Sequence, residues 1–398
     1  MAAERYLGLS EAIYVPTNIT DVVTAVVEGS LGESDERAFR QAYETLSRGG
    51  APLLGGRIDT DNRGYRFVVP DDARLTVVVR DDGDAGYWEE AHQSLDSEQA
   101  LSRLVLVRGS ERSYVTLLMH HAIADGHAAA WLFTRFWECY IAAISGEVAP
   151  VETAAALPAS MEEILRQRLG GPEPFIVPSG VFPPLGGAPA SRSRVSRIRL
   201  SRDETTALTA AARKQRTWPH AFVCGAVLLA LRDSLAAAGP VRLDCSSAVD
   251  LRSRTSPPVT LDEVTNFTGG HRVVLEVSAG DKAADLGREV LSQLDEELTK
   301  KGWQSLVIDF SGAAAQTEDF PKVVVSNLGS LPALTSPSGI VVSDIRTFVN
   351  LSQAQPVYFA NFYGGRLNIE ISYSPDSTYT EEYWERFGAC VVEQLRSV

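Results

Sequence analysis

Hydrophobic and polar residues follow two periods along this chain, a period of two that is typical of strands and a period near 3.6 that is typical of helices. Short runs rich in apolar and β-branched residues predict strands at 21–28, 64–69, 75–80, 101–107, 113–120, 241–249, 322–325, 357–362 and 366–373. Apolar residues three or four positions apart predict helices at 34–48, 128–145 and 283–301, and further helices are predicted at 218–237 and 378–396. A shorter helix is predicted within the polar segment 88–99, and capping boxes predict two more that start at 160 and 201. Both halves of the chain mix helices with strands, so the predicted fold class is α/β (α+β mixed).

The strand predicted at 113–120 is so rich in apolar residues that we expect it to be buried on both faces. The helix predicted at 128–145 follows it closely in the sequence. Between them lies the sequence His120-His121-Ala122-Ile123-Ala124-Asp125-Gly126. Two of the six histidines of the chain, an acid and a glycine therefore lie on one strand-to-helix turn, where side chains can reach a cleft.

Residues 170–190 interrupt this pattern with many prolines and glycines, which exclude a continuous helix or strand. We therefore place the domain boundary in this segment. The prediction is an N-terminal domain at 1–172 that carries the two histidines, a linker at 173–192 and a C-terminal domain at 193–398. A length of 398 residues is natural for two domains of about 150–200 residues each.

The composition is that of an ordinary globular protein, with 44% hydrophobic and 22% charged residues. No apolar run is long enough to cross a membrane, and the first residues do not resemble a signal peptide. The four cysteines suit neither a zinc site nor a disulfide framework, so a reducing cytoplasm is the expected location. The net charge of −14 argues against nucleic acid or an anionic membrane as the main partner.

One basic stretch departs from this acidic balance. Its residues are Arg192, Arg194, Arg197 and Arg199, followed by Arg213, Lys214 and Arg216. Such a patch can dock an acidic protein partner, or it can be an ordinary solvated surface. The sequence leaves both interpretations open.

Histidine is the side chain best suited to general-base catalysis near neutral pH, because its ordinary pKa lies there. The chain lacks the usual contexts of a nucleophilic serine or cysteine, a phosphate-binding loop and a dinucleotide-binding motif. This pattern favours a reaction in which the substrates supply the nucleophile and the electrophile, and the protein supplies the base.

Two other interpretations of the turn compete with a base. A metal site is disfavoured because His120 and His121 are adjacent, and neighbouring side chains on an extended segment point to opposite faces. No second cluster of Cys or His accompanies them, so we predict no metal. Two purely structural histidines are the other alternative, which Asp125 and Gly126 in the same turn weaken.

The turn resembles the His-His-x-x-x-Asp-Gly signature of chloramphenicol acetyltransferases, nonribosomal peptide condensation domains and polyketide-associated acyltransferases. With the following His-Ala-Ala, it most resembles the last group, of the mycobacterial phthiocerol/phthiodiolone dimycocerosyl transferase type. Further stretches agree in order and spacing, namely Ser160–Leu165, Val249–Arg254, Pro257–Val259 and Thr265–Gly269. The resemblance spans nearly the whole chain and is loose outside these motifs.

The resemblance implies two chloramphenicol acetyltransferase-like domains in a V-shaped pseudo-dimer, with the active site at their interface. It also implies that His121 is the catalytic base and that His120 supports the loop. Asp125 would be structural and paired with an arginine, for which Arg252 in the matching Asp-Leu-Arg stretch is the candidate.

Two further residues belong to the implied site. Gly126 would let the backbone turn tightly and approach the thioester arm. Asn327, in the sequence Ser326-Asn327-Leu328-Gly329, would border the site and help to steady the oxyanion. An ordinary turn formed by Asn-Leu-Gly is an equally good interpretation of that segment.

The expected function is that of an O-acyltransferase, which moves an acyl group from an acyl carrier protein or coenzyme A thioester to an alcohol. The product would be a polyketide- or lipid-type ester, formed without an acyl-enzyme. No bound cofactor is expected, because the phosphopantetheine-linked donor is a substrate. The expected partner is an acyl carrier protein or polyketide synthase, and the enzyme itself is expected to be a monomer.

Two alternatives remain for the function. A stand-alone condensation enzyme would use the same base to form an amide from an amine acceptor. A catalytically silent module that binds a carrier protein would not need an intact motif, so the presence of His121, Asp125 and Gly126 argues against it.

Overall fold

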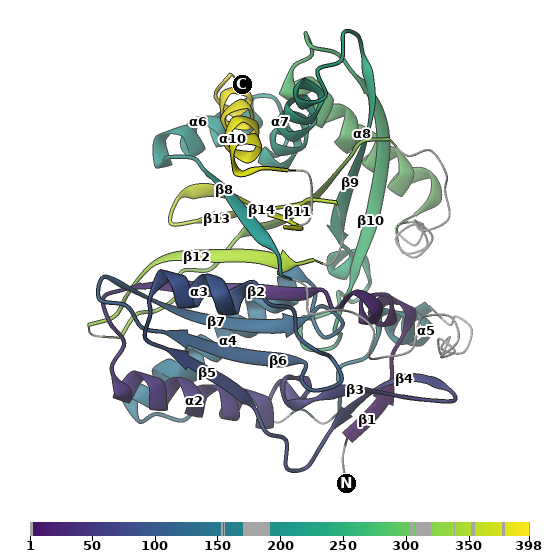
Figure 1. The fold of residues 1–398 in the computed structure, drawn as a ribbon. Helices are drawn as coiled ribbons and strands as arrows, with labels where there is room; N and C mark the ends of the chain where they lie inside the picture. Colours follow the sequence, from purple (N-terminus) through teal and green to yellow (C-terminus); the bar gives the residue numbers. More distant parts are fainter. Residues whose placement is uncertain are drawn as a thin grey trace. The chain divides into compact units, whose positions relative to one another are not determined.

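The computed structural model describes residues 3–152, 154, 156–169, 192–302, 306, 320–337, 339–351, 355–375 and 379–397. The chain divides into two compact units (Figure 1). The first comprises Met1–Ser193, Thr255–Phe267 and Pro332–Ser352, and the second comprises Arg194–Arg254, Thr268–Leu331 and Gln353–Val398. Both units mix helices with sheets, which confirms the predicted fold class. The V-shaped arrangement of two domains stays a prediction.

The predicted C-terminal domain at 193–398 is not contiguous in the structure. Its segments Thr255–Phe267 and Pro332–Ser352 belong to the first unit. Strand pairing explains the second of them, because β12 (Val341–Asn350) lies antiparallel to β2 (Thr20–Glu28). A pairing between strands some 300 residues apart leaves no local signal in the sequence, so the boundary prediction could not include it.

The larger sheet of the first unit contains the strand that leads into the two histidines. Its strand order is β12, β2, β7 (Arg112–His120), β6 (Ser102–Val107) and β5 (Thr76–Arg80). All neighbours are antiparallel except β5 and β6. Every residue from Ser113 to His120 is buried, which confirms the prediction of a strand covered on both faces.

Helices lie against both faces of this sheet. They are α2 (Glu33–Arg48), α3 (Asp84–Ala91) and α4 (Gly126–Ser145). Ser102 of β6 bonds through its hydroxyl with Tyr43 of α2, whereas the next residue, Arg103, donates to the carbonyl of Glu90 in α3 at 3.2 Å. Because adjacent strand residues point to opposite faces, α2 lies on one face together with α4, and α3 lies on the other.

The remaining elements of the first unit are short. A three-stranded sheet is formed by β1 (Ala3–Tyr6), β4 (Gly64–Val69) and β3 (Arg57–Asp61). Two short helices are α1 (Leu9–Ala12) and α5 (Met161–Leu169). Two predicted helix starts shift, because α2 begins at Glu33 after the N-cap Gly32 rather than at 34, and α3 begins at Asp84 rather than within 88–99.

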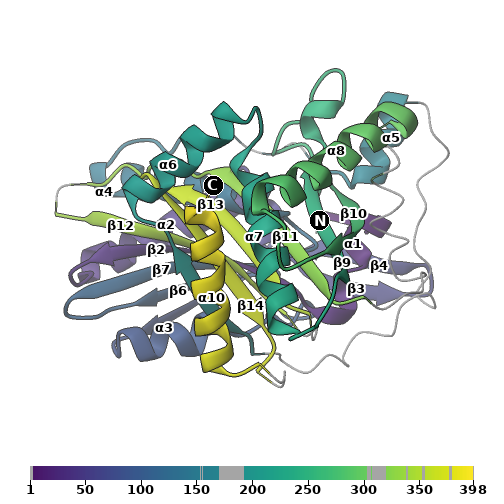
Figure 2. The same cartoon turned by 90° about the horizontal axis from the view of Figure 1, so that it is seen from above.

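The second unit is a six-stranded sheet with helices packed on one face (Figure 2). The strand order is β10 (Thr268–Val277), β9 (Val241–Asp250), β11 (Lys322–Ser330), β13 (Val357–Tyr363), β14 (Arg366–Tyr373) and β8 (Arg194–Arg199). The helices are α6 (Arg202–Lys214), α7 (Pro219–Ser234), α8 (Ala283–Lys301) and α10 (Glu381–Arg396). The predicted helix at 283–301 and the predicted strands at 357–362 and 366–373 are confirmed, and these two strands, β13 and β14, pair as a hairpin. No helix in the described residues is long and apolar enough to span a membrane.

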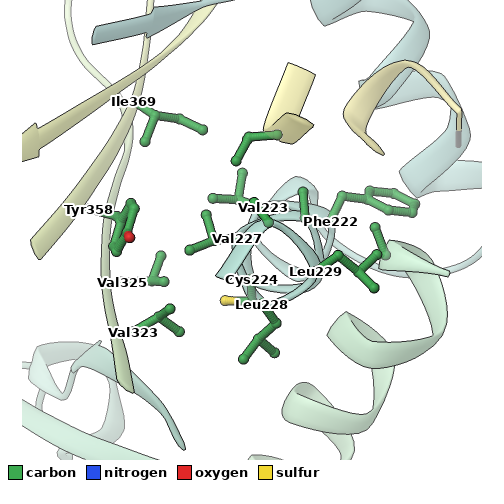
Figure 3. Close-up of a cluster of buried hydrophobic side chains, with 14 of the residues drawn as sticks. Phe222, Val223, Cys224, Val227, Leu228, Leu229, Val323, Val325, Tyr358 and Ile369 are labelled. Carbon is green, nitrogen blue, oxygen red and sulfur yellow. The ribbon is translucent and has the colours of Figure 1, made fainter. Parts of the chain in front are cut away.

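Helix α7 forms the centre of the core of this unit, and all its residues from Ala221 to Leu231 are buried. Figure 3 shows Val223 and Val227 facing Val323, Val325, Tyr358 and Ile369 of the sheet. On another side α7 lies unusually close to α8, through a glycine on each helix. A Cβ on Gly225 would lie 1.9 Å from the carbonyl oxygen of Ala283, and one on Gly287 would lie 1.8 Å from that of Ala221.

We expect Gly225→Ala to destabilise the protein, because only a movement of the α8 backbone can relieve the clash with Ala283. Overpacking of this kind costs about 1–3 kcal/mol of the free energy of unfolding, which thermal or urea unfolding would measure. Gly388→Ala in α10 is the matched control, since its Cβ meets Ile198 at an ordinary 3.4 Å and alanine favours the helix. An equal loss of stability at both positions would contradict this explanation.

Candidate active site

The two histidines lie where β7 ends and the chain turns into α4. His120 is the last residue of β7, and its carbonyl accepts a hydrogen bond from the N–H of Ile123 at 2.9 Å. Asp125 is the N-cap of α4, because its Oδ1 accepts from the N–H of Ala128 at 3.0 Å. Gly126 is the first residue of the helix and has no positive φ, so the turn itself does not require glycine. Its predicted role beside the thioester stays a prediction.

The two histidines have different surroundings, as their adjacent positions predict. The side chain of His120 is completely buried, and its Nδ1 accepts from the N–H of Ala122 at 3.2 Å. Burial, with the neighbouring His121, lowers the pKa of His120 to about 3. His120 is therefore neutral near pH 7 and bonded within the turn, which suits its predicted supporting role.

His121 retains 17% of its side-chain exposure, so its ring reaches a surface that His120 does not. Its Nδ1 lies 2.5 Å from Oδ2 of Asp21 on β2. The ring of Tyr14 stands edge-on to the imidazole, with centroids 4.2 Å apart. Of the two histidines, His121 is therefore the one with a partly exposed ring.

The charges around His121 raise its pKa. Burial by itself lowers the pKa, but the charge of Asp21 and the hydrogen bond to it outweigh this, and the charge of Asp125 adds to the increase. The phenol of Tyr14 is neutral, because burial raises its pKa far above the ordinary value. His121 is therefore a stronger base than a free histidine. It acts as a base only above its own raised pKa, where the ring is neutral.

Asp125 connects the turn to a segment from far along the chain. Its Oδ2 accepts from the N–H of Phe267 at 2.9 Å, and its own N–H donates to the carbonyl of Thr265 at 3.3 Å. This is the stretch that agreed with the acyltransferase motifs in order and spacing. Asp125 is 1% exposed, so both carboxylate oxygens act as buried acceptors, which suits the structural role predicted for it.

Two predicted site residues lie in the second unit. Arg252 is buried in a short turn after β9, where its Nη1 lies 3.2 Å from Oδ1 of Asp250. Asn327 lies within β11, and its Oδ1 accepts from the N–H of Gly329 at 2.9 Å. The pairing of Arg252 with Asp125 and the oxyanion role of Asn327 stay predictions.

The C-terminal end predicted for β11, at Val325, is wrong. The prediction ends the strand at Val325 and leaves an ordinary turn as one interpretation of Ser326–Gly329, but β11 continues to Ser330 with an irregularity between Asn327 and Ser330. Gly329 has a φ of +64°, which absorbs the irregularity without ending the strand.

The arginines predicted to dock a carrier protein, Arg192, Arg194, Arg197 and Arg199, differ in their surroundings, and their docking role stays a prediction. Arg192, the one described residue of the predicted linker at 173–192, is exposed, and its backbone forms an isolated β-bridge with Gln93. Arg194, Arg197 and Arg199 lie on β8, where alternate side chains point to opposite faces. The side chain of Arg197 is already paired within the second unit. Its Nε lies 3.0 Å from Oε1 of the buried Glu370, and its Nη2 donates a hydrogen bond to Asn368.

Sequence reasoning missed Asp21 and Tyr14. Asp21 was part of a predicted strand, and its charge was the available signal, because an acid is costly in a strand that is otherwise buried. Nothing in the sequence indicates that Tyr14 lies beside His121, because a tyrosine near the start of a domain is commonly a core residue. Among the described residues, no group of three or more His, Cys, Asp or Glu side chains could hold a metal ion.

Comparison with known proteins bears on this site and fold. Residues 189–372 match a family model described as the C-terminus of phthiocerol/phthiodiolone dimycocerosyl transferase. The enzyme of that name from Mycobacterium tuberculosis is 27% identical over 393 residues, which cover 92% of this chain and 91% of that one. The predicted resemblance is confirmed.

Solved structures agree with this assignment. Polyketide synthase associated protein 5 from Mycobacterium tuberculosis has a TM-score of 0.78 at 26% identity, covering 98% of this chain and 96% of that one. The first condensation domain of the calcium-dependent antibiotic synthetase has a TM-score of 0.71 at 16% identity, covering 99% of this chain and 97% of that one. The chain therefore has the condensation-domain fold, as predicted. The relatives named as transferases support the predicted acyltransferase activity.

We expect Asp125→Ala to lower the free energy of unfolding by about 2–4 kcal/mol, because the variant loses a helix cap and leaves the N–H of Phe267 without this acceptor. Urea unfolding would measure the loss. Ser201→Ala is the matched control, since Ser201 caps α6 through the N–H of Glu204 and should cost about 1 kcal/mol. Losses of the same size would show that Asp125 is no more than a cap.

Proposed function

We propose that this acyltransferase moves an acyl group from a thioester to an alcohol, with His121 as the general base. The observation that carries this proposal is the difference between the two histidines of the turn. His120 is fully buried with a pKa of about 3, whereas His121 is partly exposed with a raised pKa. A base must reach the acceptor and be able to hold its proton, and His121 satisfies both conditions.

The proposed reaction needs no other protein nucleophile. Nε2 of His121 takes the proton of the acceptor hydroxyl while its oxygen attacks the thioester carbonyl. The tetrahedral intermediate then collapses, the carbon–sulfur bond breaks, and the leaving thiolate takes the proton from His121. Alcohol and thioester thus become ester and thiol, and the enzyme returns to its starting state. Asn327 or a neighbouring backbone N–H is our candidate to stabilise the oxyanion.

The substrate class is proposed from the relatives. A dimycocerosyl transferase of phthiocerol and phthiodiolone, by its name, acylates lipid alcohols. We propose a polyketide- or lipid-type ester as the product here, and a phosphopantetheine-linked acyl group as the donor, with no cofactor bound to the enzyme. An acyl carrier protein of a polyketide synthase is the proposed partner, and free coenzyme A is the alternative carrier.

We expect His121→Ala to lower kcat by roughly 10²- to 10⁴-fold, the usual contribution of a positioned general base. The measurement is ester formation, followed by mass spectrometry, from a panel of acyl thioesters and alcohols. His127→Ala is the matched control, because His127 is half-buried in the first turn of α4 and should change the rate less than about threefold. Unchanged transfer by His121→Ala to every acceptor would refute the proposed base. Matched amines in the same panel would reveal an amide-forming enzyme.

For a carrier-protein donor, the later part of the basic stretch is a better candidate surface than Arg197, which is already paired with Glu370. Arg213, Lys214 and Arg216 are exposed at the end of α6, close in sequence to Trp218, which is 73% exposed. An acidic carrier can pair with these cations while the indole adds apolar contact area. We therefore propose this cluster, rather than the arginines of β8, as the docking surface.

We expect the double substitution Arg213→Glu and Arg216→Glu to lower kcat/KM for a carrier-bound acyl donor by about tenfold or more, because the charge attraction becomes repulsion. The same acyl group on a small thiol should react at the normal rate. The matched control is Arg37→Glu with Arg48→Glu on α2, whose side chains are 73% and 80% exposed. Equal slowing with both donors would contradict docking at this cluster.

A further inference from the structure

We infer that Asp21 is a positioning residue for acyl transfer, which holds His121 in the tautomer and orientation that a base requires. This inference rests on the proposed function of His121. Asp21 lies on β2, the first buried strand of the chain, and is not part of the motif at 120–126. Its side chain contacts that of His121, a residue 100 positions away in the sequence.

Backbone pairing fixes the two residues beside each other before their side chains interact. β2 and β7 are antiparallel, with Thr20 opposite His120 and Asp21 opposite Met119. One residue beyond the end of β7, the N–H of His121 donates to the carbonyl of Ile19 at 2.8 Å. The strand pairing thus continues to His121 itself, so its ring and the Asp21 carboxylate start from fixed positions.

The side-chain contact then selects one nitrogen. Nδ1 of His121 lies 2.5 Å from Oδ2 of Asp21, a short hydrogen bond of the kind a charged acceptor forms. A carboxylate accepts, so the proton lies on Nδ1 and the lone pair of the neutral ring lies on Nε2. Nε2 is then the atom that takes the proton from the acceptor, and no rotation or proton shift is needed first.

The position of Asp21 is difficult to explain by folding alone. The carboxylate is 5% exposed and lies in a strand whose residues from Thr20 to Val27 are all buried. An acid is costly there unless a charged or hydrogen-bonding partner compensates, and a valine would fit such a strand better. His121 is the hydrogen-bond partner that the described part of the chain provides for this carboxylate. The buried carboxylate therefore lowers the stability of the folded protein, and in return it fixes the orientation and tautomer of His121.

The charge of Asp21 also acts during the reaction, when His121 becomes an imidazolium. Among the residues that the structure describes, the groups that face the ring are the Asp21 carboxylate from β2, the Asp125 carboxylate from the cap of α4, neutral His120, and the neutral Tyr14 phenol edge-on. Asp21 is the one of these that is hydrogen-bonded to the ring, and so stabilises the imidazolium most. Without it, the protonated state would lose its main source of stabilisation.

The test is Asp21→Asn, which keeps the shape of the side chain and removes its charge. We expect kcat to fall roughly 10²- to 10⁴-fold, because the amide can donate to Nδ1 and favour the wrong tautomer. The pKa of His121 should also fall, so the acidic limb of the pH profile of kcat/KM should move to lower pH. A residue that only supports the fold would change the rate without moving that limb.

Asp344→Asn is the matched control, since Asp344 is a buried acid on β12, next to β2, and its Oδ1 accepts from a backbone N–H. We expect it to leave the pH profile of kcat/KM unchanged. Thermal unfolding of both variants would show whether each still folds.

A second measurement needs no variant. ¹⁵N NMR of the histidine-labelled wild-type protein should show the His121 proton on Nδ1 and a pKa above that of free histidine. A neutral ring with its proton on Nε2 would overturn the inference, as would an Asp21→Asn enzyme with normal kcat and an unmoved pH profile. If His121→Ala kept full activity, the proposed function would fail instead, so the two failures can be told apart.

Discussion

The buried carboxylate of Asp125 is the interaction on which the rest of the site depends. One oxygen caps α4, and the other accepts from the backbone of Phe267, a residue 142 positions further along the chain. A carboxylate has several acceptor sites, so one side chain can satisfy a helix end and a separate segment together. The turn that carries the two histidines is thus fixed between β7, α4 and Thr255–Phe267, and this turn determines where the two histidines lie.

Adjacent histidines in this turn become two different groups. Burial keeps His120 neutral and bonded to the backbone of the turn, whereas the negative charges next to His121 keep it basic. A strand end achieves this separation simply, since consecutive side chains point to opposite faces. The opposite directions of the two adjacent side chains, which disfavour a shared metal ion, therefore also explain why one histidine can be structural and the other chemical.

The sequence predicted the elements around the motif well and the long-range pairings poorly. The strand at 113–120, the helix after it and the helix at 283–301 followed from apolar periodicity, because each buries its own local pattern. The pairing of β12 with β2 and the contact of Asp125 with Phe267 involve distant residues and leave no periodic signal. Asp21 is an intermediate case. The sequence shows a charged residue in an apolar strand, but it does not show that His121 is its partner.

These long-range contacts also decide what can fold as a unit. A chain ending at Ser193 would contain β7, both histidines and Asp125, yet would lack β12 and the segment Thr255–Phe267. β2 would then expose an edge of unpaired backbone groups, and Asp125 would lose the N–H of Phe267. Both losses fall next to Asp21 and His121. The motif lies in the first half of the sequence, but the site it forms is a product of the whole chain.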